Sequence, residues 1–325
     1  MINKSWQGRR YYSLDAYLKN TYGQKFYKIP LSARVTCPNR DGSISTGGCI
    51  FCSQGGSGDF AGNSLDSITD QINIGKEKLT SKYPEGKYIA YFQSFTSTYA
   101  PVDYLQKIFF EAINHPDVAI LSIATRPDCL DEAVLALLEK LNQIKPVWVE
   151  LGLQTSRESV AEFINRGYKN CVYDTAVSKL KAIDINVITH IILGLPGEDK
   201  ADMISSVKYA VARGTNGLKL QLMHVLRDTK LAEFLNQEII LNEPEKDPES
   251  IEPAKVFSLL TQEEYISILA ACLEVIPEDV VIHRLTGDGP KDLLIGPLWS
   301  GHKKNVLNNI NHFLKENDSF QGKMV

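Results

Sequence analysis

The 325-residue sequence predicts an α/β protein in which helices cover a parallel sheet. Two observations predict this class. Short, nearly continuous apolar runs are typical of strands buried on both faces, and they alternate with longer segments of helical periodicity. Strand–helix–strand units of this spacing form parallel pairs. The six units are too few for a closed eight-stranded barrel, so an open partial barrel and a doubly wound sheet are the alternatives.

The predicted elements follow this alternation along the chain. We expect strands at 31–36, 88–94, 118–125, 147–153, 186–193 and 217–224. We expect helices at 65–81, 103–114, 131–142, 157–165, 173–183 and 200–213. After residue 254 the pattern predicts a helix near 262–275, a short strand near 279–283 and a helix near 303–315. Ligands of parallel α/β sheets bind at the carboxyl ends of the strands, so we expect the functional site there.

Local signals support two of the helix starts. Asp131 follows Pro127 and Asp128 and precedes the periodic apolar residues Val134 and Leu138. An acidic residue immediately before such a pattern is typical of a helix start. Pro101 and Asp103 likewise precede the periodic apolar residues Leu105 and Ile108 of the helix expected at 103–114.

The composition excludes several classes of protein. Apolar residues make up 43% of the chain and charged residues 23%, which argues against disorder and fibrous repeats. No stretch approaches the roughly 18 apolar residues that a membrane span needs. The first residues lack the apolar core of a signal peptide. The sequence therefore predicts a soluble, cytoplasmic protein with no membrane partner.

Charge is distributed unevenly along the chain. The net charge of −4 taken alone argues against a nucleic-acid partner. Residues 1–30, however, hold six basic side chains against one acid, interleaved with seven aromatic residues. Cations can engage phosphates and aromatic rings can stack on bases. The alternative is an amphipathic helix at 13–22 that caps the barrel. Residues 242–253 are acidic and proline-rich, and we interpret them as a solvated linker.

Three of the six cysteines lie within sixteen residues, in a glycine-rich segment after the first predicted strand. Cys37, Cys49 and Cys52 are spaced C-x11-C-x2-C, which supplies three thiolates rather than the four of a closed structural zinc site. A cubane iron–sulfur cluster on three thiolates keeps one iron open, and Phe51 would shield it from solvent. Zinc with histidine or aspartate as fourth ligand is the alternative, although no histidine lies in this segment.

Several motifs follow this segment along the chain. They are Cys37-Pro-Asn-Arg-Asp-Gly42, Gly47-Gly-Cys-Ile-Phe-Cys52, Gly56-Ser-Gly-Asp-Phe60, Thr125-Arg-Pro-Asp128, Glu150-Leu-Gly-Leu-Gln-Thr155, Gly194-Leu-Pro-Gly-Glu198 and Arg284-Leu-Thr-Gly-Asp288. Together they resemble the radical S-adenosylmethionine (SAM) superfamily, and more narrowly its YhcC/YtqA-type branch, which is related to the elongator catalytic subunit. The usual superfamily spacing is C-x3-C-x2-C, and the longer first interval marks this branch.

The resemblance implies a partial (β/α)6 TIM-like barrel with an N-terminal basic arm and a C-terminal α/β extension. The arm would be residues 1–30, the barrel 31–240, and the acidic linker with its extension 241–325. The resemblance also implies a [4Fe–4S] cluster on Cys37, Cys49 and Cys52, whose open iron binds S-adenosyl-L-methionine. One electron then cleaves SAM to methionine and a 5′-deoxyadenosyl radical, which abstracts hydrogen from the substrate.

Further cofactor contacts are implied at the ends of the strands. Gln93 and Ser94 stand where the superfamily often has a Gly-Gly-Glu motif that contacts the methionyl amino group. Glu150 and Gln154 are expected to contact the ribose or the methionyl group, the alternative being a hydrogen-bonded barrel interior. Arg126 is expected to pair with a ligand carboxylate or phosphate, or with a structural acid.

The fifth and sixth strands carry the remaining candidates. Gly194, Leu195 and Pro196 are expected to face the adenine with their backbone, or to form an ordinary turn. His190 is expected to be a satisfied interior group. His224, at the end of the sixth predicted strand, is a catalytic candidate together with Glu150.

The substrate and partners come mainly from the resemblance. The elongator subunit modifies the wobble uridine of tRNA. The YtqA-type branch implies conversion of 5-carboxymethylaminomethyl-(2-thio)uridine to the 5-aminomethyl form, with an electron donor such as flavodoxin or ferredoxin. Neutralising Arg9, Arg10 and Lys25 is then expected to weaken tRNA binding. A radical SAM enzyme acting on a small molecule and a non-catalytic RNA-binding metalloprotein are the alternatives.

Overall fold

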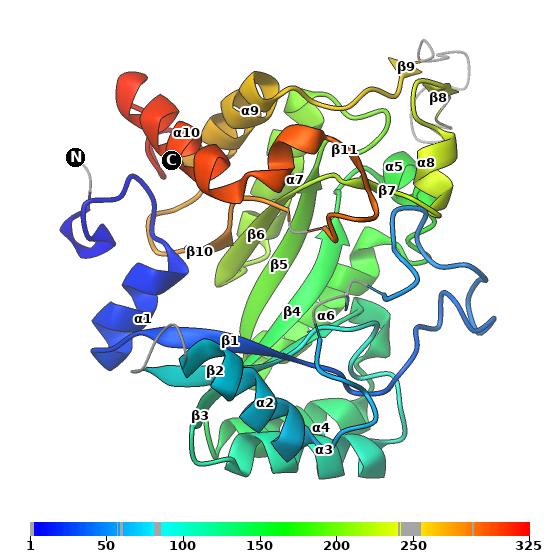
Figure 1. Ribbon diagram of the computed structural model, residues 1–325, viewed down its shortest axis with the longest axis vertical. Helices are drawn as coiled ribbons and strands as arrows, with labels where there is room; N and C mark the ends of the chain where they lie inside the picture. Colours follow the sequence, from blue (N-terminus) through cyan, green and yellow to red (C-terminus); the bar gives the residue numbers. More distant parts are fainter. Residues whose placement is uncertain are drawn as a thin grey trace.

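The computed structural model contains a curled parallel sheet of seven strands that forms a half-barrel (Figure 1). The structure describes residues 3–56, 58, 61–80, 86–239, 241, 255–287 and 289–325. Within these residues the strands lie in the spatial order β1-β2-β3-β4-β5-β6-β10, and all neighbours are parallel. Their bounds are β1 Phe26–Leu31, β2 Lys87–Phe92, β3 Val118–Thr125, β4 Val147–Gln154, β5 Asn186–Leu193, β6 Gly217–Leu222 and β10 Val281–Arg284. The predicted partial barrel is therefore confirmed.

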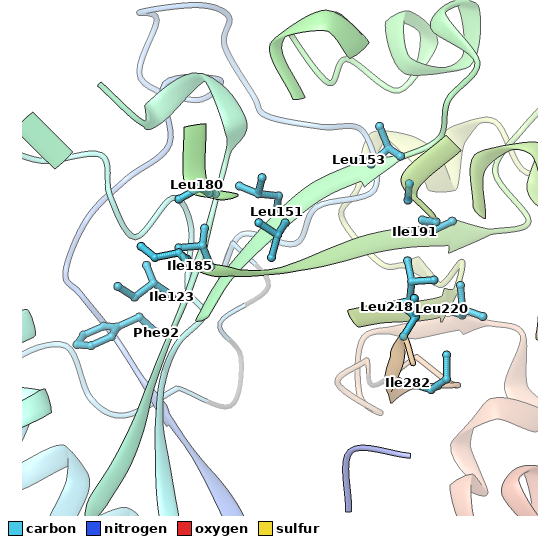
Figure 2. Packing of buried hydrophobic residues seen from close by; sticks show 14 of the residues in the cluster. Phe92, Ile123, Leu151, Leu153, Leu180, Ile185, Ile191, Leu218, Leu220 and Ile282 are labelled. Carbon is cyan, nitrogen blue, oxygen red and sulfur yellow. The ribbon is translucent and has the colours of Figure 1, made fainter. Parts of the chain in front are cut away.

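Helices cover the outer face of this sheet. They are α2 Ile68–Thr80, α3 Val102–Asn114, α4 Glu132–Asn142, α6 Asn170–Ala182, α7 Lys200–Ala212, α9 Gln262–Glu274 and α10 Lys303–Glu316. Strand side chains such as Phe92, Ile123 and Leu151 belong to the main buried cluster, and Figure 2 shows them near Leu180 of α6 and Ile185. Removal of this apolar surface from water holds the helices against the sheet.

Local capping follows the signals in the sequence. The Asp131 carboxylate accepts a hydrogen bond from the Val134 amide and so caps α4. The buried residues of α4 are Val134, Leu135, Leu137, Leu138 and Leu141, all of which face the core. The helix start predicted at Asp131 is therefore confirmed.

Shorter elements surround the sheet. These are α1 Leu14–Tyr22, α5 Glu158–Phe163, α8 Lys230–Glu233, the 3-10 turns Lys4–Trp6, Pro127–Cys129 and Leu298–Gly301, and the antiparallel pairs β7 Val225–Leu226 with β11 Leu294–Gly296 and β8 Glu238–Ile239 with β9 Lys255–Val256. The predicted acidic linker at 242–253 lies outside the described residues. In the part of the chain that is described, no helix combines the length and apolar character needed to cross a membrane.

The first strand is the main error of the sequence prediction. The sequence predicts it at 31–36, but β1 spans Phe26–Leu31 and lies almost wholly in the predicted N-terminal arm. Lys28 and Pro30 break the apolar run that predicts a buried strand. A proline is tolerated here because β1 is an edge strand of the sheet. The segment 32–36 instead leaves the strand and leads into the cysteine-rich loop.

A seventh strand also distinguishes the structure from the six units of the prediction. The short strand expected near 279–283 is β10, and it pairs in parallel with β6 rather than standing apart from the sheet. The C-terminal part of the chain therefore extends the barrel wall. Strand pairing of this kind depends on tertiary closure, which the local sequence pattern does not encode.

Inside the half-barrel, side chains form layers because alternate residues of each strand face the same side. Four buried apolar residues near the amino ends of the strands form one layer, which we call the amino-end layer: Ile89, Ile120, Trp148 and Ile188. Leu18 of α1 packs into the same cluster, with Tyr17 and Leu14 at its margin. Helix α1 therefore closes the amino end of the barrel, which matches the capping alternative for the arm.

The rest of the arm is held by the C-terminal residues. Arg10 forms an ion pair of 2.8 Å with Asp318, and the Tyr12 amide donates to Gln321 Oε1 at 2.9 Å. Trp6 is fully buried. In Figure 1 the arm and the cysteine-rich loop lie at opposite ends of β1. Apart from Lys28 in β1, the described part of the arm is thus at the end of the barrel away from the carboxyl ends of the strands.

Candidate active site

A cavity of about 270 Å³ opens at the carboxyl ends of the strands, and we call it the barrel cavity. It is lined by side chains of β2 to β6 and β10 or the residues just after them, and by the loop at 36–56, which we call the cysteine loop. Nine of the predicted site residues line it: Cys37, Cys49, Phe51, Cys52, Gln93, Arg126, Glu150, Gln154 and His224. The structure therefore brings together most of the candidates named from the sequence.

Backbone hydrogen bonds and Arg40 give the cysteine loop its shape. The Cys37 carbonyl accepts from the Arg40 amide at 2.8 Å, and the Cys52 amide donates to the Cys49 carbonyl at 3.0 Å. The Arg40 guanidinium crosses the loop and donates to the carbonyl of Cys52 at 3.1 Å. Gly48 has φ +81°, and a Cβ there would lie 2.8 Å from Arg40 Nε. A glycine is therefore needed where the two halves of the loop meet.

The cysteine loop is also docked on the turn after α5. Asn39 Nδ2 donates to the Asn165 carbonyl at 2.6 Å, and Asn165 Nδ2 donates to the Gly48 carbonyl at 2.8 Å. The Ile50 amide donates to the Ile164 carbonyl at 3.1 Å. These bonds fix the loop against the barrel and hold its three cysteines at the cavity.

The three cysteines of the predicted cluster site lie at one cavity. All three are free thiols that line the same cavity. Among the described residues, no three His, Cys, Asp or Glu side chains converge as ligands of a single metal ion. A closed zinc site gathers four ligands around one ion, whereas a cubane cluster binds each thiolate through a different iron. Burial, with the neighbouring Cys52 and Cys37 thiols, raises the pKa of Cys49 to about 12. A bound metal centre would overcome this by holding the thiolate directly.

Two residues beyond the amino-end layer, toward the carboxyl ends of the strands, the barrel interior becomes polar. Each of the first six strands contributes one side chain to this polar layer: Lys28, Tyr91, Ser122, Glu150, His190 and Lys219. Glu150 lies at its centre and is 1% exposed. Its Oε1 accepts from Lys28 Nζ and Ser122 Oγ, both at 2.8 Å. Its Oε2 accepts from His190 Nε2 at 2.7 Å and pairs with Lys219.

These contacts determine the ionisation of the polar layer. Burial opposes ionisation of Glu150, but Lys219, Lys28 and His190 outweigh it and hold the pKa of this carboxyl well below its usual range. Burial and the neighbouring Lys219 lower the pKa of His190 to about 4. A neutral His190 therefore donates its Nε2 proton to the carboxylate. Both Glu150 oxygens already have two partners, which favours the barrel-interior alternative. A cofactor contact or catalytic role for Glu150 stays a prediction.

Arg126 is held by groups of the chain itself. Its guanidinium makes two hydrogen bonds to the Asp128 carboxylate, of 2.9 and 2.7 Å, and donates to the Arg166 carbonyl at 2.8 Å. It also lies over the ring of Tyr168, 4.8 Å from the centroid. The structure thus shows the structural ion pair that was one alternative for Arg126, at a position that still lines the barrel cavity.

The polar residues Gln93, Ser94 and Gln154, at the ends of β2 and β4, differ in whether they line the cavity. Gln93 directly follows β2 and lines the cavity, whereas the buried Ser94 is not among the lining residues and lies 3.3 Å from Ser32 Oγ. Gln154 ends β4 with φ +60° and accepts from the Tyr168 hydroxyl at 3.3 Å. Gln93 and Gln154 therefore present polar groups to a ligand in the cavity.

The segment after β5 lies outside the cavity lining. Gly194, Leu195 and Pro196 are absent from the described residues that line it. Gly194 has φ +92°, and a Cβ there would lie 2.9 Å from Leu260 Cδ1, so this turn packs against the C-terminal part of the chain. The expected adenine contact stays a prediction. His224, two residues after β6, lines the cavity and lies close to Gly287, where a Cβ would come within 2.6 Å of its ring.

The sequence reasoning missed three groups that shape the site. Lys219 and Tyr91 of the polar layer line the cavity, as does Tyr168. The signal for Lys219 was present, because Lys219 and Gln221 interrupt the apolar run of the sixth strand on one face. Tyr168 lies between the helices α5 and α6 and carries no comparable signal.

Two family descriptions match the sequence. The family described as the Radical SAM superfamily matches residues 40–210, more than half of the chain. The Radical_SAM C-terminal domain matches residues 253–316, a range that includes α9 and β10.

Two relatives and one solved structure extend this result. YtqA from Bacillus subtilis (strain 168) is 41% identical over 315 residues, covering 97% of this chain and 92% of YtqA. YhcC from Escherichia coli (strain K12) is 31% identical over 300 residues, covering 92% of this chain and 90% of YhcC. The archaeal Elp3 of Methanocaldococcus infernus shares the fold, with a TM-score of 0.64 at 15% identity, over 91% of this chain. This chain spans 64% of that Elp3 chain. The chain belongs to the radical SAM superfamily, whose cofactors are a [4Fe–4S] cluster and SAM.

Proposed function

We propose that this radical SAM enzyme modifies the wobble uridine of tRNA, converting 5-carboxymethylaminomethyl-(2-thio)uridine to the 5-aminomethyl form. The observation that carries the proposal is the barrel cavity, where three free cysteines meet polar side chains from consecutive strands. We infer the substrate from the motifs that this chain shares with the YhcC/YtqA-type branch. The shared fold with archaeal Elp3 is consistent with this choice.

Cys37, Cys49 and Cys52 would hold the [4Fe–4S] cluster and leave one iron for SAM. A bound cluster, reduced by a donor such as flavodoxin or ferredoxin, would supply the one-electron cleavage of SAM through which radical SAM enzymes abstract hydrogen from a substrate. Phe51, which packs against a buried apolar cluster, would shield it from water.

The chain's own residues would orient SAM and exclude water. Gln93 and Gln154 offer amide groups to the methionyl and ribose parts of SAM from β2 and β4. The polar layer and the amino-end layer close the cavity below, so a radical formed there is sheltered from solvent. In this proposal residues 31–240 carry the chemistry, while 1–30 and 241–325 supply the two edge strands of the barrel.

Exposed basic residues on segments that adjoin the cavity lining, which we call the rim, would offer a surface for RNA. Arg34, Arg227, Lys230 and Lys291 are exposed on the segments that follow β1, β7 and β10. The Lys230 ammonium lies beside Gly47 of the cysteine loop. Cations around the mouth would contact phosphates while one base enters the cavity, because single-stranded loops present bases that can be splayed out. Helix α1 and the described arm residues before it lie at the other end of the barrel.

The test is a reaction with defined tRNA. Anaerobically reconstituted protein is mixed with a reductant, SAM and tRNA that carries the carboxymethylaminomethyl group, and the nucleosides are measured by mass spectrometry. We expect loss of that nucleoside, gain of the aminomethyl form and formation of 5′-deoxyadenosine. A parallel reaction without SAM should leave the tRNA unchanged. SAM cleavage with an unchanged wobble nucleoside would contradict the tRNA substrate.

A further inference from the structure

The polar layer is an unusual interior for a barrel. Barrel interiors are normally filled by branched apolar side chains, and burying an ion costs several kcal/mol unless partners compensate it. Here the layer places two lysines, Lys28 and Lys219, around the single carboxylate of Glu150. The fold therefore holds more potential positive than negative charge at this level of the barrel.

Lys219 is the cation of this layer that faces the cavity. Its side chain is 4% exposed and lines the barrel cavity, whereas Lys28 is not among the lining residues. Its ammonium carries three N–H donors. Two of them are accounted for by Glu150 and by the Tyr91 hydroxyl, the latter at 2.9 Å. Among the described residues the third donor has no acceptor.

The walls of the cavity are cationic as well. Glu150 is the single acidic residue among the described lining residues, and its two oxygens are already shared by four partners. Arg284 lines the cavity next to Lys219, to which it is paired across β10 and β6. A ligand that enters the cavity thus meets Lys219 at the floor, beside one carboxylate whose two oxygens already have partners.

The charges around Lys219 also favour the binding of a negatively charged group. Burial is the main reason that the pKa of Lys219 lies well below its usual range, and Lys28 and Arg284 act in the same direction, against Glu150. A negatively charged group bound at Lys219 would relieve this imbalance and favour the ammonium form. A charge-assisted hydrogen bond in a buried site is among the stronger polar contacts.

We propose that Lys219 is the floor of a carboxylate-binding subsite, which holds the carboxylate of the substrate's carboxymethylamino group. This inference rests on the proposed function, since it assigns one contact of that substrate. With the carboxylate at Lys219, the methylene between carboxylate and amine would lie above the polar layer, toward the strand ends and the cysteine loop. Lys219 would thus select the substrate and position the carbon from which hydrogen is abstracted.

The experiment compares two anticodon stem-loops that differ in this carboxylate. One carries 5-carboxymethylaminomethyluridine and the other 5-methylaminomethyluridine, and both are titrated against the reconstituted wild-type protein. Hydrogen bonds to charged groups contribute about 1.5–3 kcal/mol, so we expect about a 10- to 100-fold preference for the carboxylate form. In Lys219→Met the preference should fall to near unity, and Lys219→Arg should keep part of it because the positive charge remains.

Further measurements keep the test decisive. Lys219→Met leaves Glu150 with one partner fewer, so its iron and sulfide content and its SAM affinity are measured first. If the folding of this variant is impaired, the double variant Glu150→Gln/Lys219→Met, which removes both charges, takes its place. Weakened SAM binding together with an unchanged stem-loop preference would assign Lys219 to the methionyl carboxylate and overturn the proposal.

The two proposals fail in different ways. If the wild-type protein does not convert the carboxymethylaminomethyl nucleoside, the proposed function fails and this subsite falls with it. If the wild type converts the nucleoside while Lys219→Met keeps the full preference, the subsite alone is refuted.

Discussion

The two ends of the half-barrel interior are built from the same strands, but one end is apolar and the other is polar. Near the amino ends, β3, β4 and β5 contribute Ile120, Trp148 and Ile188 to an apolar layer sealed by α1. Two residues further along, the same strands contribute Ser122, Glu150 and His190 to a polar layer. Alternate residues of a strand share a face. The apolar layer that stabilises the fold and the polar layer that lines the site are therefore only two residues apart along each strand.

This comparison separates stability from chemistry. Apolar burial at the amino end lowers the free energy of the fold, whereas the polar layer and the cysteine loop present groups that a purely structural interior would not need. We therefore expect substitutions at the two ends to have distinguishable effects.

The largest effect is expected in the cysteine loop. Cys52→Ala removes one of the three thiolates, so the cluster should be lost and SAM cleavage should fall to background. Cys171→Ala is the matched control, because Cys171 is exposed on α6 away from the cavity lining and its loss should change nothing. The measurement is 5′-deoxyadenosine formation by reconstituted protein. Cleavage retained in Cys52→Ala would refute its assignment as a ligand.

The opposite end should show a large effect on stability instead. Trp148 is 2% exposed, and its ring lies 6.2 Å from that of Tyr17 and 5.4 Å from that of His283. Trp148→Ala should lower the free energy of unfolding by about 3–5 kcal/mol, since it leaves a cavity in the amino-end layer. Urea unfolding measures this. The exposed Leu298→Ala should change stability by less than about 0.5 kcal/mol. An equally small change in Trp148→Ala would show that this layer is not a tightly packed core.

The polar layer should make stability depend on pH. The pKa of His190 is lowered from 6.5 to about 4. Between these values the unfolded chain binds a proton at this histidine that the native protein does not. The native state should therefore gain about 3 kcal/mol as pH rises from about 4 to 6.5, and lose it again as pH falls. His190→Gln should flatten the stability profile in this window. A variant profile as steep as that of the wild type would assign the dependence to other groups.

The smallest effect is expected at the rim. Arg227→Gln with Lys230→Gln should weaken tRNA binding and reduce its dependence on salt by about one unit of slope for each phosphate that the protein no longer neutralises. Arg9→Gln with Lys25→Gln, in the arm at the other end, should leave the slope unchanged. Binding titrations over a range of salt concentrations measure both. If the arm pair changed the slope and the rim pair did not, RNA would bind at the amino end.

Much of the fold was predictable because several strands are apolar along their whole length. β3 and β5 begin and end at the predicted residues. β1 was misplaced because Lys28 and Pro30 interrupt the apolar pattern that predicts a buried strand. Lys28 is accommodated because it faces Glu150 across the barrel, and Pro30 because β1 is an edge strand. The pairing of β10 with β6 joins segments about 60 residues apart and follows from closure of the whole barrel.

The site was predictable where chemistry leaves a local signature. The cysteine spacing identified the loop, and strand-end positions identified Gln93, Gln154 and His224, all of which line the cavity. Lys219 could not be paired with Glu150 from sequence, because the contact crosses β5 and exists only when the sheet curls. The ion pair of Arg126 with Asp128 is local, but the spacing of the two residues does not show whether the guanidinium pairs with this acid or with a ligand.

The most direct test is the metal and sulfide content of the anaerobically reconstituted wild-type protein. We predict about four iron atoms and four sulfide ions per chain, the content of one [4Fe–4S] cluster. We also predict an electron paramagnetic resonance spectrum of the reduced protein that changes when SAM is added. Zinc at one atom per chain without sulfide would contradict the cluster assignment, because the cysteine loop would then hold a structural ion and the cavity beside it no radical chemistry.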